Sequence, residues 1–345
     1  MEAAEWAIES ATPEPVGNCA LLDDGTLAPE RTVTVCVVCC STPSMSSDVI
    51  HAVTRALSSV ATVRAVVLSD SVETLVGVDV VAVAQGTKLS KIRRLAALVD
   101  ADLICICDPD MRVDAEACRL VFGRAAAEFR RGSEVIAFGI VEGINAGSLL
   151  SRVIALDKWL SHRVLRRLLW ACGIGITLPG QFLIASARLL RSLDPGVDSY
   201  LDDLYLGWVA RTQRVRVHRV PVVVGKEEPR TTWGSLLTQR LRWMKGLACL
   251  FRHLGNRPSA AFLLTVHFLA YHGLPISVLL SLSAFCIVSP LAAAAAFAAL
   301  VFLLARCSGH SIWTAATFLV AFPAVHCLAT LLWWIPASRS YLVRR

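Results

Sequence analysis

The chain has 345 residues, of which 55% are hydrophobic, and its 34 Lys and Arg outnumber 27 Asp and Glu to give a formal net charge of +7. This length can form one substantial hydrophobic core and leaves a further segment outside it. Zinc-finger spacing, RNA-binding signatures and basic-aromatic repeats do not occur in the sequence, so the positive charge does not indicate nucleic acid as a partner.

The charged residues are unevenly distributed along the chain. Residues 1–30 contain seven Asp and Glu but no Lys or Arg, which predicts a flexible acidic tail. The remainder is therefore strongly basic. That balance suits anionic lipid head groups and diphosphates as partners.

Residues 31–230 alternate between apolar runs typical of buried strands and segments with helical periodicity. This alternation predicts an α/β domain with a parallel or mostly parallel sheet. In such sheets ligands bind beyond the carboxyl ends of the strands, where Asp70 and Asp108 stand. Strands are expected at 33–40, 63–70, 78–84, 103–107 and 135–140, and helices at 46–60, 88–99 and 114–131.

The segment 148–170 has the pattern of a basic amphipathic helix, as expected for a helix lying in a membrane interface. An ordinary surface helix packed on the core fits the same pattern. Asp157 falls within the apolar side, and the pattern gives no reason for it. The apolar side consists of Leu150, Val153, Ile154, Leu160, Val164 and Leu168, and the basic side of Arg152, Lys158, Arg163, Arg166 and Arg167.

The last third of the chain is predicted to meet a membrane. A second amphipathic helix is expected over about 234–254, within an interfacial segment at 231–258. In the region that follows, 259–336, Arg306 is the one charged residue, as expected for membrane-spanning helices. It divides into about three spans, near 261–281, 284–305 and 312–334. The middle one could instead be re-entrant, so the side on which the chain ends stays open.

Two acidic motifs stand at predicted element ends. Asp108 and Asp110 flank a proline just after a buried strand, and two carboxylates so placed can hold a divalent cation against a diphosphate. Asp202 and Asp203 open a predicted helix, where one acid is explained by capping. The alternative is a general base, because adjacent like charges raise a carboxylate pKa. Each motif alone is weak.

Gln239, Arg242 and Trp243 stand at i, i+3 and i+4 of the second amphipathic helix, on one face. An amide, a guanidinium and an indole together can bind a diphosphate and stack against a sugar ring. A plain amphipathic helix is the competing interpretation.

In this order, the motifs resemble the inverting family 2 glycosyltransferases with a GT-A fold and a QxxRW motif, the group that includes cellulose, chitin and hyaluronan synthases and the ceramide glucosyltransferases. DADLICICDPDMRVD resembles the strand bearing the metal-binding DxD, LDDLYLG resembles the ED-x-x-L-G segment with Asp202 in place of Glu, and KEEPRTTWGSLLTQRLRWMKG resembles the stretch ending in QxxRW. The resemblance covers about residues 33–250. It implies a GT-A domain, a nucleotide-binding mixed sheet, followed by interfacial and transmembrane helices.

The resemblance implies roles for the acidic residues and for the glycine before them. Asp108 and Asp110 would hold Mg²⁺ or Mn²⁺ on the donor diphosphate, and Asp203 would be the catalytic base. Asp202 and Gly180 would lie on the acceptor side, Gly180 in a loop that matches the family only loosely.

Further roles follow for the basic and aromatic residues. Arg242 would face the leaving diphosphate, and Trp243 with Gln239 would form the acceptor platform. Either Lys88 or Lys91 would belong to the nucleotide or diphosphate pocket.

The nucleotide pocket departs from the family pattern in two places. Asp70 matches an aspartate that contacts the nucleotide, but a doublet is usual there. The first strand runs into CCSTPS in place of a tyrosine-asparagine-glutamate ending. The identity of the nucleotide base in the donor is therefore less well predicted than the type of reaction.

The resulting hypothesis is an integral protein of the plasma or inner membrane, with a cytoplasmic catalytic domain that moves a hexose from a nucleotide-diphosphate sugar, with UDP favoured, to a lipid or lipid-linked acceptor. A polysaccharide synthase subunit with a channel-forming partner is the first alternative. A non-catalytic membrane scaffold that binds a nucleotide sugar is the second. Nucleotidyl transfer would leave both the QxxRW motif and the membrane region unexplained.

Overall fold

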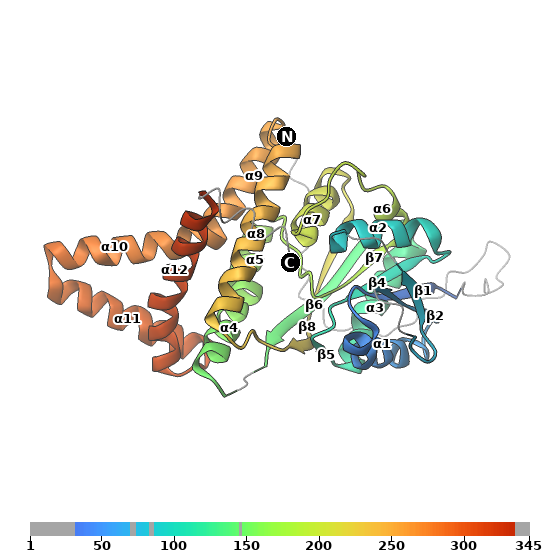
Figure 1. Ribbon diagram of the computed structural model, residues 1–345, viewed down its shortest axis with the longest axis horizontal. Helices are drawn as coiled ribbons and strands as arrows, with labels where there is room; N and C mark the ends of the chain where they lie inside the picture. The colour runs from blue at the N-terminus through green and yellow to red at the C-terminus, as the bar shows by residue number, and fades with distance from the viewer. Residues whose placement is uncertain (1–31, 70–73, 83–85, 145–146, 335–345) are drawn as a thin grey trace.

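A central sheet organises the folded part of the chain, as seen in a computed structural model that describes residues 32–69, 74–82, 86–144 and 147–334. The sheet has eight strands in the order β3-β2-β1-β4-β7-β6-β8-β5 (Figure 1). The strands are β1 (Thr34–Cys39), β2 (Thr62–Ser69), β3 (Asp79–Ala82), β4 (Leu103–Cys107), β5 (Met111–Val113), β6 (Val135–Gly143), β7 (Phe182–Ser186) and β8 (Arg216–Glu227).

The sheet is mixed. Strands β1 to β4 pair in parallel, as do β6 and β8, whereas β7 runs antiparallel to both of its neighbours and β5 runs antiparallel to β8. Together with the apolar helices at the end of the described chain, this confirms the predicted fold class. The short strands β5 and β7 and the long strand β8 are additions to the five strands expected from the sequence.

Helices cover both faces of the sheet, which is why the central strands are continuously apolar. Successive residues of β1 alternate between two cores: Cys36 lies in one and Val37 in the other. The first core contains α2 (Lys88–Leu98), α6 (Ala187–Arg191) and α7 (Asp202–Thr212), and the second contains α1 (Pro43–Leu57) and α3 (Ala115–Arg130).

The segment predicted as one amphipathic helix contains a change of helix type. It comprises α4 (Leu149–Trp159), the π-helix η1 (Leu160–Leu165) and α5 (Arg166–Ala171). A π-helix bonds residues five apart, so the faces beyond it no longer follow the α-helical period. Arg166, expected on the basic side, is therefore buried, and Leu168, expected on the apolar side, is 55% exposed. The prediction was wrong for these two residues.

Six helical elements follow β8 in the described part of the chain: α8 (Trp233–Leu254), α9 (Pro258–Phe268), the π-helix η2 (Leu269–Gly273), α10 (Leu274–Val288), α11 (Pro290–Ser308) and α12 (Ile312–Trp334). Among the described residues, three stretches are long and apolar enough to cross a membrane: Pro258–Val288, Pro290–Ser308 and Ile312–Trp333. The first joins α9, η2 and α10.

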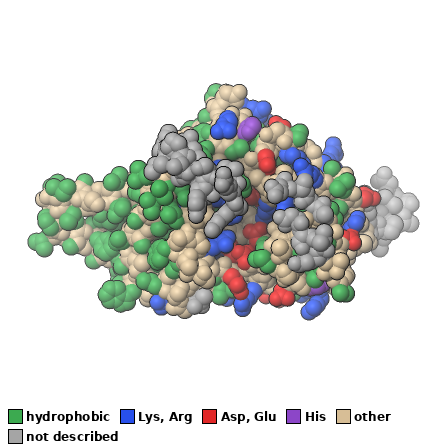
Figure 2. Space-filling model, viewed as in Figure 1, with side chains coloured by type: hydrophobic (Ala, Val, Ile, Leu, Met, Phe, Trp, Pro, Cys, Tyr) green, Lys and Arg blue, Asp and Glu red, His purple; other side chains and the backbone are tan. Residues whose placement is uncertain are grey.

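The last helices differ in how much protein they contact. The α10–α11 hairpin extends away from the sheet (Figure 1), and α10 contributes no buried residue. A third core joins α4 and α8 to α11 and α12. The α10–α11 surface is covered with hydrophobic side chains (Figure 2), as expected for lipid contact.

Candidate functional site

The carboxyl end of β4, the start of α2, the loop before β7 and the start of α7 meet at one place. Asp108 directly follows β4, and its backbone N–H donates to the carbonyl of Gln181, 2.8 Å away. That bond ties the acidic turn to the loop containing Gly180. Figure 2 shows acidic and basic side chains gathered in the hollow at the middle of this face, beside the apolar helices.

Lys88 joins three of the predicted site residues. Its Nζ lies 2.6 Å from Asp108 Oδ1, 2.5 Å from the carbonyl oxygen of Gly180 and 3.7 Å from Asp202 Oδ2. Lys91, one turn further along α2, makes no ion pair with the described residues. Of the two lysines between which the sequence left a choice, Lys88 is the one that lies in the cluster.

Asp203 stands in the first turn of α7 next to Asp202. Its Oδ1 accepts the N–H of Leu204 at 2.8 Å. Desolvation by the surrounding protein and the charge of Asp202 raise the pKa of Asp203 to about 7, against the lowering effect of Arg166. A carboxylate with a pKa near neutrality can take up a proton at physiological pH.

Gly207 brings the loop before β7 against α7. A Cβ atom at Gly207 would lie 1.8 Å from the carbonyl oxygen of Ile176, so only glycine allows this approach. The contact leaves Gly180 beside Asp203: a Cβ at Gly180 would lie 3.6 Å from Asp203 Oδ2. The predicted base therefore borders the predicted acceptor loop.

Asp110 lies among charged groups that sequence reasoning missed. Lys158 of α4 forms an ion pair with Glu227 at the end of β8. Burial, Glu227 and Asp108 raise the pKa of Asp110 to about 6, while Lys158 and Arg230 lower it. Glu227 lies in the KEEPR stretch, and Lys158 was assigned only to a basic helix face. Their pairing joins positions far apart in sequence, and no local pattern signals it.

The carboxylates suit a divalent cation. Asp110 Oδ1 is buried and has no hydrogen-bond partner within the described part of the chain, as expected for an oxygen that binds a ligand. No three His, Cys, Asp or Glu side chains of the described residues form a complete metal site. Asp108 and Asp110 instead fit a site in which one or two carboxylates bind Mg²⁺ or Mn²⁺ together with phosphate oxygens of a ligand.

The QxxRW residues lie on α8 with different exposures. Gln239 and Trp243 are half-buried, and Arg242 is exposed and makes no ion pair with any described residue. The buried arginine is Arg240, which is 2% exposed. Sequence reasoning had given Arg240 no role.

Arg240 connects three helices. Its Nη2 lies 2.9 Å from Asp157 Oδ2 of α4. Its guanidinium lies 4.0 Å from the ring centre of Trp243 and 5.0 Å from that of Phe322 in α12. The pair explains the aspartate on the apolar side of the predicted amphipathic helix. It also fixes one side of the Trp243 indole.

Asp70, which was predicted to contact the nucleotide, lies outside the described residues.

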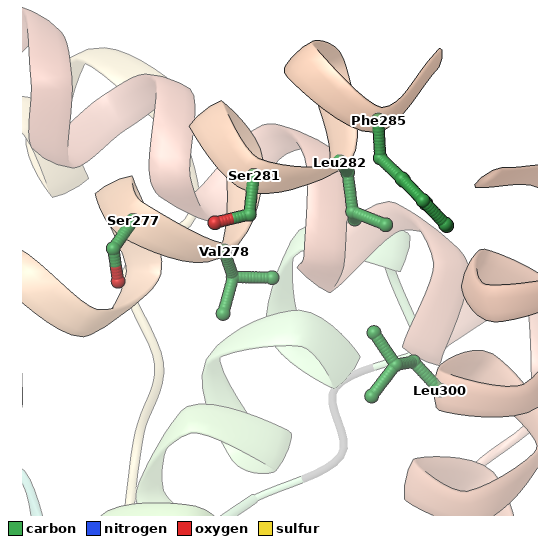
Figure 3. A pocket seen from close by; sticks show the side chains of 6 residues that line it. All are labelled: Ser277, Val278, Ser281, Leu282, Phe285 and Leu300. Atoms are coloured by element: carbon green, nitrogen blue, oxygen red, sulfur yellow. The ribbon is translucent and has the colours of Figure 1, made fainter. Parts of the chain in front are cut away.

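An apolar groove of about 390 Å³ lies between α10 and α11, lined by Ser277, Val278, Ser281, Leu282, Phe285 and Leu300 (Figure 3). Because its lining contains no charged group, the groove does not suit the diphosphate chemistry indicated at Asp108 and Asp203.

Comparisons with known proteins identify a family. The family model described as Glycosyl transferase family group 2 matches residues 103–336, more than half of the chain. No curated protein matches the chain.

Solved structures of glucosyl-3-phosphoglycerate synthase from Mycobacterium tuberculosis are similar to the chain. The complex with Mn²⁺, UDP and glucosyl-3-phosphoglycerate is 20% identical, with a TM-score of 0.45. The complex with Mg²⁺ and UDP is 17% identical, with a TM-score of 0.43. Each similarity covers 65% of this chain and 80% of the other.

Proposed function

The chain belongs to glycosyl transferase family group 2, and we propose that it transfers a hexose from a uridine diphosphate sugar to a hydroxyl group of a membrane lipid at the cytoplasmic face. The observation that carries the proposal is the cluster of Lys88, Asp108, Asp202 and Asp203 next to a helical region with three candidate membrane spans. Asp203, whose pKa is near neutrality, and Lys88 with Asp108, which suit a diphosphate, therefore lie together beside an apolar helical region.

The reaction is a single displacement at the anomeric carbon. Asp203 accepts the proton of the acceptor hydroxyl while that oxygen forms a bond to the anomeric carbon. The bond from that carbon to the diphosphate oxygen breaks, and nucleoside diphosphate leaves with the bonding electron pair. Attack from the opposite side inverts the anomeric configuration. The pKa of about 7 supports this role for Asp203.

Asp108 and Asp110 are the residues that would hold Mg²⁺ or Mn²⁺. Bound there, the ion would neutralise negative charge on the diphosphate of the donor. The buried, unpartnered Oδ1 of Asp110 supports this assignment. Lys88 would add a fixed positive charge beside the same phosphates, since its Nζ already lies 2.6 Å from Asp108.

The remaining residues are assigned by their position. The exposed Arg242 would reach the leaving diphosphate, and Trp243 with Gln239 would contact the acceptor. Asp202 and Gly180 border Asp203 and would orient the acceptor hydroxyl. Asp70 is proposed as a nucleotide contact from its resemblance alone, and Lys91 is the weaker of the two lysine candidates.

The test uses the purified full chain with a labelled UDP-sugar, Mn²⁺ and membrane lipid extract, after a thermal-shift screen has chosen the sugar. We expect label in the organic phase and release of UDP. An insoluble labelled product would instead indicate a polysaccharide synthase. Donor binding without UDP release from any lipid would indicate a non-catalytic scaffold, and either result would overturn the proposal.

A further inference from the structure

Arg166, the first residue of α5, is a buried cation with few partners. It is 5% exposed, and its Nη1 lies 3.0 Å from His162 Nδ1. Since a guanidinium only donates hydrogen bonds, that ring nitrogen must accept, and it also lies 3.4 Å from the N–H of Val141. The Nε of Arg166 has no partner in the described part of the chain.

The charge of Arg166 is also unpaired at close range. No carboxylate of the described residues lies within ion-pair distance, and Asp203 acts on it only from further away. Burial lowers the Arg166 pKa, while the nearby Tyr271 and Asp203 oppose that shift. A buried cation without a close counter-charge is strongly unfavourable, so a missing anionic group would complete the site.

Tyr271 lies beside Arg166, and its hydroxyl interacts with the Arg166 guanidinium. The hydroxyl is buried and has no other hydrogen-bond partner among the described residues. Tyr271 belongs to η2, within the candidate span Pro258–Val288. Arg166 is therefore close both to the proposed base and to a residue of the first candidate membrane span.

The surroundings favour a negative ligand. Three more arginines, Arg163, Arg167 and Arg219, lie in the same region. Burial makes the largest contribution to lowering the pKa of Arg219, and the positive charges of the neighbouring arginines, Arg166 among them, lower it further. One of them, Arg163, is paired with Glu142 at 2.6 Å. Arginine binds phosphate and carboxylate oxygens through paired hydrogen bonds.

We propose that Arg166 and Tyr271 form a subsite for the phosphate of an anionic lipid acceptor, whose head group also carries the hydroxyl that receives the sugar. The inference rests on the proposed function and narrows its acceptor class. The lipid phosphate contacts the Arg166 guanidinium and the Tyr271 hydroxyl, the head-group hydroxyl faces Asp203, and the chains follow the apolar helix that carries Tyr271. The donor diphosphate is assigned elsewhere, beside Lys88 and Asp108.

Binding without donor tests the subsite independently of catalysis. The purified full chain in detergent is titrated with dioctanoyl-phosphatidylglycerol, with dioctanoylglycerol, which has the same chains but no phosphate, and with inorganic phosphate. We expect the anionic lipid to bind at least tenfold more tightly than either of the other two. Equal affinity for the two lipids would overturn the proposal. Phosphate binding as tight as that of the anionic lipid would overturn the lipid assignment.

The variants assign the preference to residues. Arg166→Gln should remove the difference between the two lipids, and Tyr271→Phe should reduce it about threefold. Arg55→Gln is the matched control, since Arg55 is an exposed arginine in the last turn of α1, which packs in the second core, and it should keep the wild-type preference. If folded Arg166→Gln keeps the wild-type preference for the anionic lipid over dioctanoylglycerol, the proposal is wrong.

Folding and donor binding are measured in parallel. If Arg166→Gln does not fold, Arg166→Lys, which keeps the charge but loses the planar fork, should lower the preference and Tyr271→Phe provides the second test. Weakened binding of UDP with Mn²⁺ in a folded Arg166 variant would assign the residue to the donor and overturn the proposal. If the wild type binds no UDP, the proposed function fails, while the comparison of the two lipids still decides the subsite.

Discussion

Two buried arginines lie in neighbouring helical regions, and only one of them has a close counter-charge. Arg240 of α8 is paired with Asp157 at 2.9 Å and lies against two aromatic rings. Arg166 of α5 has no carboxylate within ion-pair distance among the described residues. The Nε atom of each guanidinium lacks a hydrogen-bond partner among those residues, so the two arginines differ in their counter-charge: the charge of Arg240 is neutralised within the protein, and that of Arg166 is not. Arg240 therefore belongs to the architecture of the protein, and Arg166 to its binding chemistry.

The largest effect is expected from breaking the complete pair. Asp157→Ala leaves the Arg240 guanidinium buried without its counter-charge and should cost about 3 kcal/mol of folding stability. The apparent melting temperature in detergent measures the loss. Asp79→Ala is the control, because its partner Arg64 is mostly exposed, and it should change the melting temperature little.

A double variant sharpens the interpretation of the Asp157 result. Asp157→Leu with Arg240→Met removes both charges and should recover most of the lost stability. If the single change lowers the melting temperature no more than Asp79→Ala does, the Arg240 pair is not the structural contact described above.

The second-largest effect is expected on the transfer rate, from a change to Asp203 in the region of Arg166. Asp203→Asn removes the proposed base with little change in shape, so the transfer rate should fall by about two orders of magnitude. Binding of the UDP-sugar should remain. Initial rates and donor affinity measured on the same preparation test this expectation. A fall of less than tenfold with intact donor binding would contradict the assignment of the base.

The pH dependence of transfer should follow Asp203. Its raised pKa, about 7, means that the carboxylate is increasingly protonated below neutrality and cannot accept a proton there. The value of kcat/KM should therefore fall about tenfold for each pH unit below 7 and level off above about 8. Asp202→Asn removes a like charge that raises this pKa, so its acid limb should lie at lower pH. A flat profile between pH 5.5 and 8 would rule out this base.

The smallest effect is expected at the metal. Asp110→Asn keeps the size of the side chain but removes one charge, so the Mn²⁺ concentration for half-maximal transfer should rise about tenfold. Titration of the transfer rate with Mn²⁺ checks this. Glu116→Gln, on the exposed first turn of α3, serves as a control for loss of an acid elsewhere, and an equal response in both variants would refute the role of Asp110.

The sheet half of the protein was largely predictable from sequence, because strand periodicity and strand ends are local features. Asp108 follows a continuously apolar run, and parallel packing brings it to the edge where Lys88 begins α2. The strand β7 was missed, since its five residues, four of them apolar, have no turn signal that separates them from α6. In β8 the register with β6 shifts twice near Ile140, which obscures simple alternation.

The helical half was less predictable, because its decisive contacts are long-range. Arg240 and Asp157 stand 83 residues apart in sequence, and nothing local marks them as partners. The π-helix η1 changes which side of α5 faces the core, so the helical period misassigned Arg166. The predicted acidic tail at 1–30 lies outside the described residues, and the residue roles in the site stay predictions until the variants are measured.

The shared core between α9 and the sheet constrains how the molecule can be divided. Ala260, Leu263 and Leu264 of α9 lie in the same core as α2, α6 and α7, although α9 opens the first candidate span. A fragment that ends before Pro258 would leave an apolar cavity in the core beside α2, α6 and α7, and it would be prone to aggregate. A water-soluble version must therefore keep α9 and end beyond it, with the residues of η2 exposed on its new surface made polar.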